Sequence, residues 1–186
     1  MIKSRYEQYA NKNVGYLTEE LLAGYYESLI SLCRGARKQA EKIKRVETHD
    51  SALQYALTCE EILSETERHV SHRLHEYVPY LKDLAVKADT GHDCAGCKGG
   101  CQLNHEVRVL ELNATNDMMK KLLSKLQFST LPLYSETIFP EDYRLLRSNM
   151  ALLETNLTEL FFLENNFLIP GIADAQKQIN AGNHAK

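Results

Sequence analysis

The stretch that decides the fold is residues 141–169, which read EDYRLLRSNMALLETNLTELFFLENNFLI. Its leucines and phenylalanines recur at spacings of three and four, which is the period of an amphipathic α-helix. Acidic residues stand in its first turn, where they favour a helix N-terminus, and a Pro-Gly pair follows its last residue. We therefore expect one long helix over these residues, ending at Pro170.

Three segments upstream show the same helical period. They cover residues 18–46, 50–88 and 102–127. The first begins at Thr18, which two glutamates follow, so Thr18 is the expected N-cap. The second contains Pro79, at which we expect a kink or a break, because proline cannot donate a helical hydrogen bond.

Four long helices without any strand alternation predict an all-α protein. The expected architecture is an antiparallel four-helix bundle, in which four apolar stripes close around one core. The length of 186 residues suits a single domain over residues 1–186, with its core in about 17–170. A Cys/Gly loop over 89–101 and a C-terminal tail over 171–186, with a short helix through IADAQKQI, are expected to lie outside that core.

The composition argues against several classes of protein. A net charge of −3 gives no electrostatic reason to expect binding to nucleic acid or to a membrane surface. No apolar run approaches the roughly 20 residues that a bilayer span needs, and the polar N-terminus is not typical of a signal peptide. We expect a cytoplasmic protein with reduced thiols, in which Cys33 and Cys59 are small buried hydrophobes.

Polar side chains on the apolar helix faces are candidates for a functional site. Glu164 shares its face with Leu157, and His105 shares its face with Leu112, so both side chains are expected to point inward. A buried carboxylate needs a partner, which can be a metal ion, a base or a proton. His69 lies on the flank of its helix's apolar stripe. No Glu-x-x-His pair occurs in the chain, which disfavours a ferritin-like di-iron bundle.

The end of the long helix, LENNFLIPGI, resembles the hemerythrin-like, or HHE cation-binding, domains, and in particular their branch associated with repair of iron–sulfur centres. Those domains end a ligand helix with the pattern H-x-x-x-E-N-N-x-L-F-P. Here Glu164 falls on the carboxylate and Pro170 on the proline, and the order of elements agrees from about residue 17 to 170. The resemblance implies a hemerythrin-like fold, iron as the cofactor, and a role in metal binding or in redox or gas sensing.

The ligand set that the resemblance implies is incomplete. Aligned on its proline, the family's second-helix motif H-x-x-x-E-E-x-x-L-F-P places its histidine on His69 and its carboxylate on Arg73. The third-helix histidine falls on His105, but Leu160 stands where a histidine should precede Glu164, and the first helix offers no histidine. Either one metal ion binds to His69, His105 and Glu164, or Arg73 and Glu164 form a buried ion pair in its place.

The sequence HDCAGCKGGCQLNH, residues 92–105, contains a second candidate site. Its cysteines follow the spacing C-x2-C-x3-C, and C-x2-C is the usual half-site for zinc, which takes four ligands. His92, Cys94, Cys97 and Cys101 can supply a Cys₃His zinc site, or the thiols can hold an iron–sulfur cluster with a further ligand. Thiol–disulfide chemistry, which the lysine among the thiols favours, and a loop without a role are the alternatives.

Two functions of different kinds agree with these patterns. The first is a hemerythrin-like bundle for metal, redox or gas sensing, whose partner is a metal ion or a small gas molecule. The second is a bundle that kept only the fold and binds a protein partner without a metal. An enzyme is less favoured than either, because the sequence shows no nucleophile–base pair, no phosphate loop and no complete metal triad.

Overall fold

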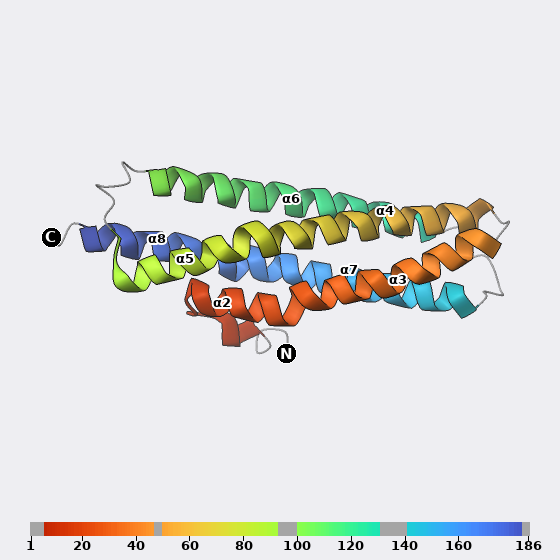
Figure 1. The fold of residues 1–186 in the computed structure, drawn as a ribbon, viewed down its shortest axis with the longest axis horizontal. Coiled ribbons are helices and arrows are strands. Elements are labelled where there is room, and N and C mark those ends of the chain that lie inside the picture. Colours follow the sequence, from red (N-terminus) through yellow and green to blue (C-terminus); the bar gives the residue numbers. More distant parts are fainter. Residues whose placement is uncertain (1–5, 47–49, 93–99, 131–140, 184–186) are drawn as a thin grey trace. The chain divides into compact units, whose positions relative to one another are not determined.

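The computed structural model describes residues 6–46, 50–92, 100–130 and 141–183, and their regular structure is entirely helical (Figure 1). A short 3₁₀ turn, Glu7–Tyr9, precedes the first α-helix. No β-strand occurs in these four ranges, so the predicted all-α class is confirmed. Within the same ranges, no helix is long and apolar enough to cross a membrane.

The helical elements correspond to the four predicted segments. The first segment forms α2 (Val14–Leu21), the π-helical turn η2 (Leu22–Tyr26) and α3 (Glu27–Val46); the second forms α4 (Asp50–His72), the π-helical turn η3 (Arg73–Tyr77) and α5 (Val78–Thr90); the third forms α6 (Gly100–Thr130); and the fourth forms α7 (Glu141–Leu163), the π-helical turn η5 (Glu164–Leu168) and α8 (Ile169–Asn183). The predicted boundaries hold closely, except at the start of the first segment and the end of the fourth.

Two prolines lie inside continuous helix, and each follows a five-residue π-helical turn. In each turn the residue before the proline donates its N–H to a carbonyl five residues back, that of Arg73 or Glu164. The wider turn accommodates Pro79 and Pro170, whose rings would crowd the carbonyl four residues back in a regular α-helix. The disturbance expected at Pro79 is therefore a π-helical turn rather than a break. The predicted helix end at Pro170 is wrong.

The segment predicted as a C-terminal tail is largely helix, since α8 runs as far as Asn183. It buries one apolar stripe, made up of Ile172, Ala175 and Ile179. Gly171 lies where α8 meets α2, and a Cβ atom there would stand 3.2 Å from Leu17 Cδ1. This glycine therefore allows the two helices to approach closely, and the Pro-Gly pair serves packing rather than chain termination.

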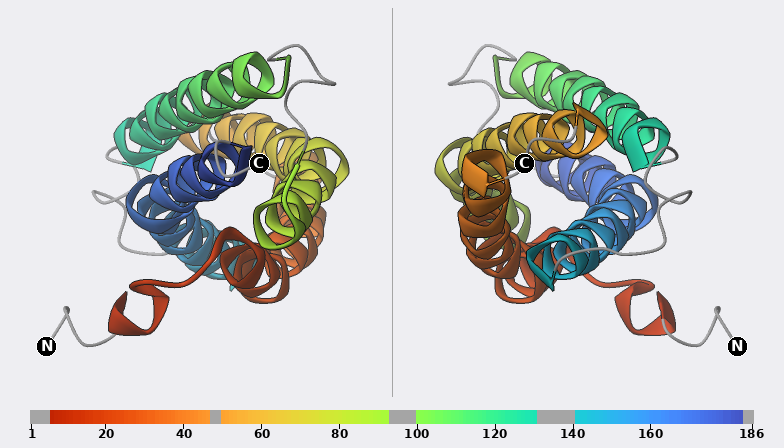
Figure 2. Two further views of the ribbon diagram at one scale, coloured as in Figure 1. Left: turned by 90° about the vertical axis from the view of Figure 1, so that its left-hand side faces the viewer. Right: turned by 90° about the vertical axis from the view of Figure 1, so that its right-hand side faces the viewer.

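The chain divides into two compact units, and Figure 2 shows the same helices in two further views. The first comprises Met1–Tyr25, His72–Ala114 and Leu160–Lys186. The second comprises Tyr26–Ser71 and Thr115–Glu159.

The first unit is built from α2, α5 and α8, which pack against one another, together with the N-terminal part of α6. Lys82 on α5 forms an ion pair with Glu19 on α2 at 2.8 Å. Gly15 lies where α2 meets α5, because a Cβ atom there would stand 3.1 Å from Ala85 Cβ.

The second unit contains α3, α4, the C-terminal part of α6, and α7. Side-chain hydrogen bonds join its neighbouring helices: Arg37–Glu67 from α3 to α4, Lys125–Glu61 from α6 to α4, Gln127–Glu154 from α6 to α7, and Asn149–Gln39 from α7 to α3. Cys33 and Cys59 are fully buried in this unit, and burial raises the pKa of each thiol to about 12. The prediction that they are small buried hydrophobes is confirmed.

The start of α2 is set by Asn13 rather than by Thr18. The Asn13 side chain accepts a hydrogen bond from the Tyr16 N–H at 2.8 Å. Thr18 lies inside the helix, where its buried hydroxyl donates to the Val14 carbonyl at 2.7 Å. Because the helix starts at Val14, Val14 and Leu17 are buried in the core, which stabilises the fold. The preference of a residue type for the N-cap position does not include this burial. The predicted N-cap at Thr18 is therefore wrong.

Asn13→Ala is expected to lower the free energy of unfolding by about 1 kcal/mol, because it leaves the Tyr16 N–H without its capping acceptor. Asn13→Asp should cost much less, since a carboxylate accepts the same bond and is favourable at a helix N-terminus. Urea denaturation followed by circular dichroism measures both. Equal losses would show that the side-chain bond is not what stabilises this end.

Candidate functional site

The interior of the first unit holds an arginine and a glutamate in direct contact. Arg73 Nε lies 3.2 Å from Glu164 Oε1, and both side chains are 0% exposed. Arg73 is the first residue of η3 and Glu164 is the first residue of η5. Removing two charges from water costs several kcal/mol per ion, and their attraction offsets this only where further hydrogen bonds complete the geometry.

Arg73 has such further partners. Its Nη2 donates to the Leu112 carbonyl of α6 at 3.3 Å. Its guanidinium carbon lies 4.6 Å from the centre of the Tyr77 ring, within the range of a cation–π interaction. A carboxylate, a carbonyl and an aromatic face therefore surround this cation, and they come from three different helical segments.

Tyr77 connects the buried pair to charged groups nearer the surface. Its hydroxyl lies 2.9 Å from the Arg108 carbonyl and 3.1 Å from Glu111 Oε2. Burial raises the pKa of Tyr77, against the opposing effect of Arg73, so the hydroxyl keeps its proton and can donate to either acceptor. Arg108 in turn forms ion pairs with Glu76 at 3.5 Å and with Glu111 at 3.8 Å.

His105 is buried on α6, with 6% of its surface exposed. Its Nδ1 lies 2.5 Å from the hydroxyl oxygen of Tyr80 on α5. Burial lowers the pKa of His105, Lys87 and His92 lower it further, and Asp83 opposes them. The imidazole is therefore neutral near pH 7. The prediction that His105 and Glu164 point into the interior is confirmed.

The three residues predicted as iron ligands differ in their surroundings. Glu164 forms an ion pair with Arg73 in the first unit. His105, on α6, also belongs to the first unit. His69 belongs to the second unit and is 6% exposed. Across the described ranges, no group of three or more His, Cys, Asp or Glu side chains is placed to hold a metal ion. Leu160, which stands where the family pattern has a histidine, is a fully buried core residue.

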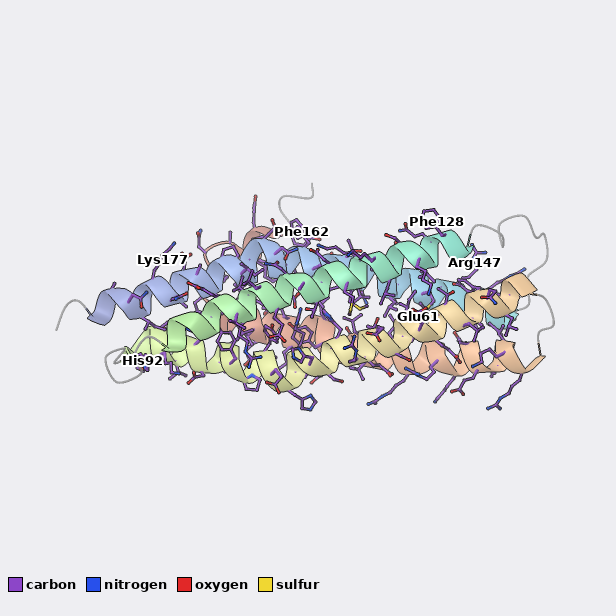
Figure 3. The ribbon with its side chains drawn as sticks, turned by 90° about the horizontal axis from the view of Figure 1, so that it is seen from above. Glu61, His92, Phe128, Arg147, Phe162 and Lys177 are labelled. Atoms are coloured by element: carbon purple, nitrogen blue, oxygen red, sulfur yellow. The ribbon has the colours of Figure 1, made fainter. Side chains whose placement is uncertain are left out.

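The second predicted site lies mostly outside the described residues. Cys94 and Cys97 are outside them, and Cys101 is described only in its backbone, in the first turn of α6, one turn before His105. His92 follows the end of α5 (Figure 3), and it is close enough to influence the pKa of His105. Zinc, a cluster or thiol exchange at these cysteines stays a prediction.

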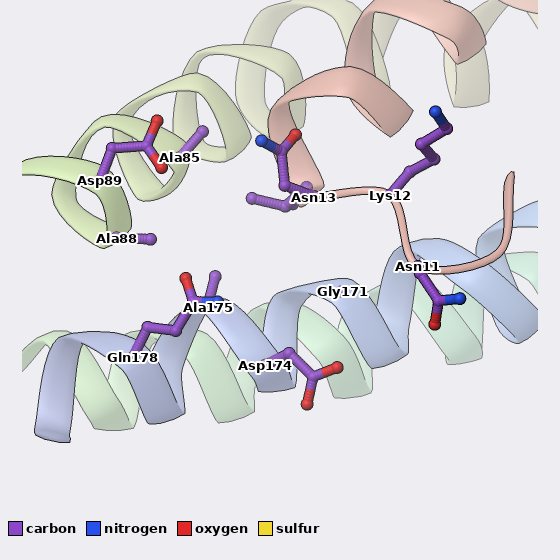
Figure 4. Close-up of a pocket in the computed structure, with 11 residues that line it drawn as sticks. Asn11, Lys12, Asn13, Ala85, Ala88, Asp89, Gly171, Asp174, Ala175 and Gln178 are labelled. Carbon is purple, nitrogen blue, oxygen red and sulfur yellow. The ribbon is translucent and has the colours of Figure 1, made fainter.

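A polar pocket of about 170 Å³ lies in the first unit between the residues that precede α2 and the helices α5 and α8 (Figure 4). Its polar lining includes Asn11, Asn13, Asp89, Asp174 and Gln178. The carboxylates of Asp89 and Asp174 lie on opposite sides of the opening and do not point toward each other. Asp174 is also paired with Lys177 at 3.0 Å, so this pocket lacks the converging oxygen ligands that a divalent cation requires.

Sequence reasoning did not identify the aromatic residues of the site. Tyr77 and Tyr80 follow Arg73 at spacings of four and seven, which places all three on one helix face. Tyrosines on the face of an inward arginine were the available signal. The Leu112 carbonyl could not be identified from the sequence, because every residue has a backbone carbonyl. Only the packing of α6 brings this one to Arg73.

Arg73→Ala is expected to lower the free energy of unfolding by about 3–5 kcal/mol, because it leaves the Glu164 carboxylate buried without its cation. The double variant Arg73→Met/Glu164→Gln should lose far less than the sum of the single changes Arg73→Met and Glu164→Gln, since it removes both charges together. Urea denaturation of the four proteins gives the coupling free energy.

Arg68→Ala is the matched control on α4. Arg68 is 66% exposed and pairs with Glu65 within one helical turn, so its loss should change stability by no more than about 0.5 kcal/mol. An Arg73→Ala change as small as that of the control would contradict the assignment of a buried, mutually dependent pair.

Lowering the pH from 7.5 to 5.5 is expected to destabilise the fold through His105. Its folded-state pKa lies below the unfolded value of about 6.5, so the unfolded chain binds more protons in this range. The stabilisation is complete above about pH 6.5 and is lost as the pH falls toward the folded-state pKa, by at most about 1.4 kcal/mol at pH 5.5.

Unfolding curves across this pH range for wild type, His105→Gln and the exposed-site control His75→Gln make the comparison. The dependence should become flatter in His105→Gln and stay unchanged in His75→Gln. Identical pH dependence in wild type and His105→Gln would show that the buried imidazole does not contribute.

No protein-family model, no curated protein and no solved structure matches this chain. Its function is therefore inferred from its own residues.

Proposed function

We propose that this chain is an antiparallel four-helix bundle of the hemerythrin-like type that binds its partner without a metal, in the cytoplasm. The Arg73–Glu164 pair takes the position that a metal ion has in such bundles. The supporting observation is the 3.2 Å contact between Arg73 Nε and Glu164 Oε1, with both side chains fully buried.

A cation at Glu164 would have to compete with the guanidinium of Arg73. Arginine keeps its charge at all physiological pH values, so a metal ion bound to the same carboxylate would face a fixed positive charge a few ångströms away. Releasing Glu164 from Arg73 would also strand the arginine inside the unit, at a cost on the scale of about 3–5 kcal/mol. Both effects disfavour iron in this interior and favour a function that needs no metal there.

The histidines support the same conclusion. His105 is turned toward Tyr80 through Nδ1. A metal-binding histidine usually directs its second nitrogen to a carboxylate, a carbonyl or water that raises its basicity. The partner of His105 Nδ1 is instead a tyrosine hydroxyl, which is not one of these groups.

A second candidate function is metal or redox sensing at the Cys loop, with zinc or an iron–sulfur cluster as the bound group. His92 favours it, because this residue lies near His105 and precedes the three clustered cysteines. This function is compatible with the ion pair, since it does not use Glu164.

Purified protein incubated with Fe²⁺ without oxygen, then freed of excess metal, is expected to retain far less than one iron per chain. Elemental analysis and a visible spectrum measure this in wild type, in Glu164→Gln and in Cys94→Ser/Cys97→Ser. Metal that disappears only in the cysteine variant belongs to the loop and supports the second candidate.

A different result would overturn the main proposal. Two irons per chain that persist in the cysteine variant and are lost in Glu164→Gln would place a metal centre in the interior, in spite of Arg73.

A further inference from the structure

The surface between α6 and α8 of the first unit contains a pocket of about 370 Å³. Its walls are mainly apolar and include Val109 and Leu110 from α6 and Ile169 and Ile172 from α8. Leu110 is 69% exposed, although it borders a hollow that other apolar side chains line. Pockets of roughly 300–1,000 Å³ with apolar walls and a few polar groups are typical of small-molecule sites.

One buried polar side chain, His105, lines this pocket. In the described part of the chain, its side chain forms one hydrogen bond, between Nδ1 and the Tyr80 hydroxyl at 2.5 Å. The hydroxyl has no other acceptor among those residues, so we assign its hydrogen to this bond. A neutral imidazole that accepts at Nδ1 carries its own hydrogen on Nε2, which leaves Nε2–H as a donor for a ligand.

The charges of the lining limit the kind of ligand. Glu106 contributes to the lining, and no lysine or arginine does so among the described residues. A carboxylate or phosphate ligand would meet this negative charge without a cation to compensate it. A neutral oxygen acceptor can use the His105 Nε2–H without that repulsion.

We propose that this pocket binds an uncharged molecule with an apolar body and a single carbonyl-type oxygen, which accepts a hydrogen bond from His105 Nε2. The inference rests on the proposed function in one respect: no metal takes part. Ketones, quinones and esters have the required chemistry. Their apolar part would cover the leucine and isoleucine walls, and their oxygen would meet the one buried donor.

The test uses three probes of nearly equal shape on the full chain: 2-acetonaphthone, 2-ethylnaphthalene and 2-naphthoate. Heteronuclear NMR titration reports affinity and shifted residues together. The ketone is expected to bind about five- to tenfold more tightly than the hydrocarbon, on the scale of one neutral hydrogen bond, and the carboxylate should bind most weakly. Shifts should fall on α6 and α8. His105→Phe/Tyr80→Phe should bring the ketone to the affinity of the hydrocarbon.

Ala173→Trp provides a variant whose folding is not at risk, because Ala173 is an exposed residue of the pocket rim. It should abolish ketone binding, whereas Ala151→Trp, at an exposed alanine of α7 outside the pocket, should leave it unchanged. Absence of saturable binding, undiminished binding in Ala173→Trp, or carboxylate binding as tight as the ketone would each overturn the proposal. Concentration-dependent shifts of the same residues without any probe would overturn it as well, since a second copy would then cover the pocket. Iron in the interior would instead contradict the proposed function and leave the probe affinities as measured.

Discussion

Two opposite charges held away from water constrain how the segments of the first unit pack. Arg73 and Glu164 lie on segments far apart in the sequence, and neither tolerates separation from the other. An apolar stripe can slip by one turn and still bury leucines, at a modest cost. A slip of η3 against η5 by one turn would leave two uncompensated charges in the interior, so this pair fixes the register of these segments.

The same two residues also carry the backbone irregularity of their helices. The carbonyls of Arg73 and Glu164 accept the i→i+5 bonds of η3 and η5, and Pro79 or Pro170 follows each turn. A π-helical turn inserts one residue and rotates the side chains that follow it. Phe167 lies inside η5, three residues after Glu164, so a regular α-helix would place it on the same face as Glu164. It is only half-buried, and its ring lies 5.8 Å from that of Tyr9.

Much of the fold follows from the sequence because helical periodicity is a local property. Spacings of three and four locate each long segment. The features that sequence analysis missed depend on tertiary packing. Thr18 has the chemistry of an N-cap, but burial of Val14 and Leu17 moves the helix start to Asn13. Pro170 is a residue that commonly ends a helix, but here the preceding π-helical turn lets the helix continue through it. In the site, inward Glu164 and His105 are readable from their helix faces, whereas the roles of Tyr77 and of the Leu112 carbonyl require the packed structure.

A buried guanidinium and a bound metal ion need different sets of partners. Iron and zinc require several donors at fixed distances, each from a separate side chain. The Arg73 guanidinium donates hydrogen bonds to one carboxylate and one backbone carbonyl, and it lies over an aromatic face. Leu160 can then be an ordinary core residue, because Arg73 does not need a histidine there. Glu164, which the resemblance assigns to a metal ion, is in this structure the carboxylate that compensates the charge of Arg73.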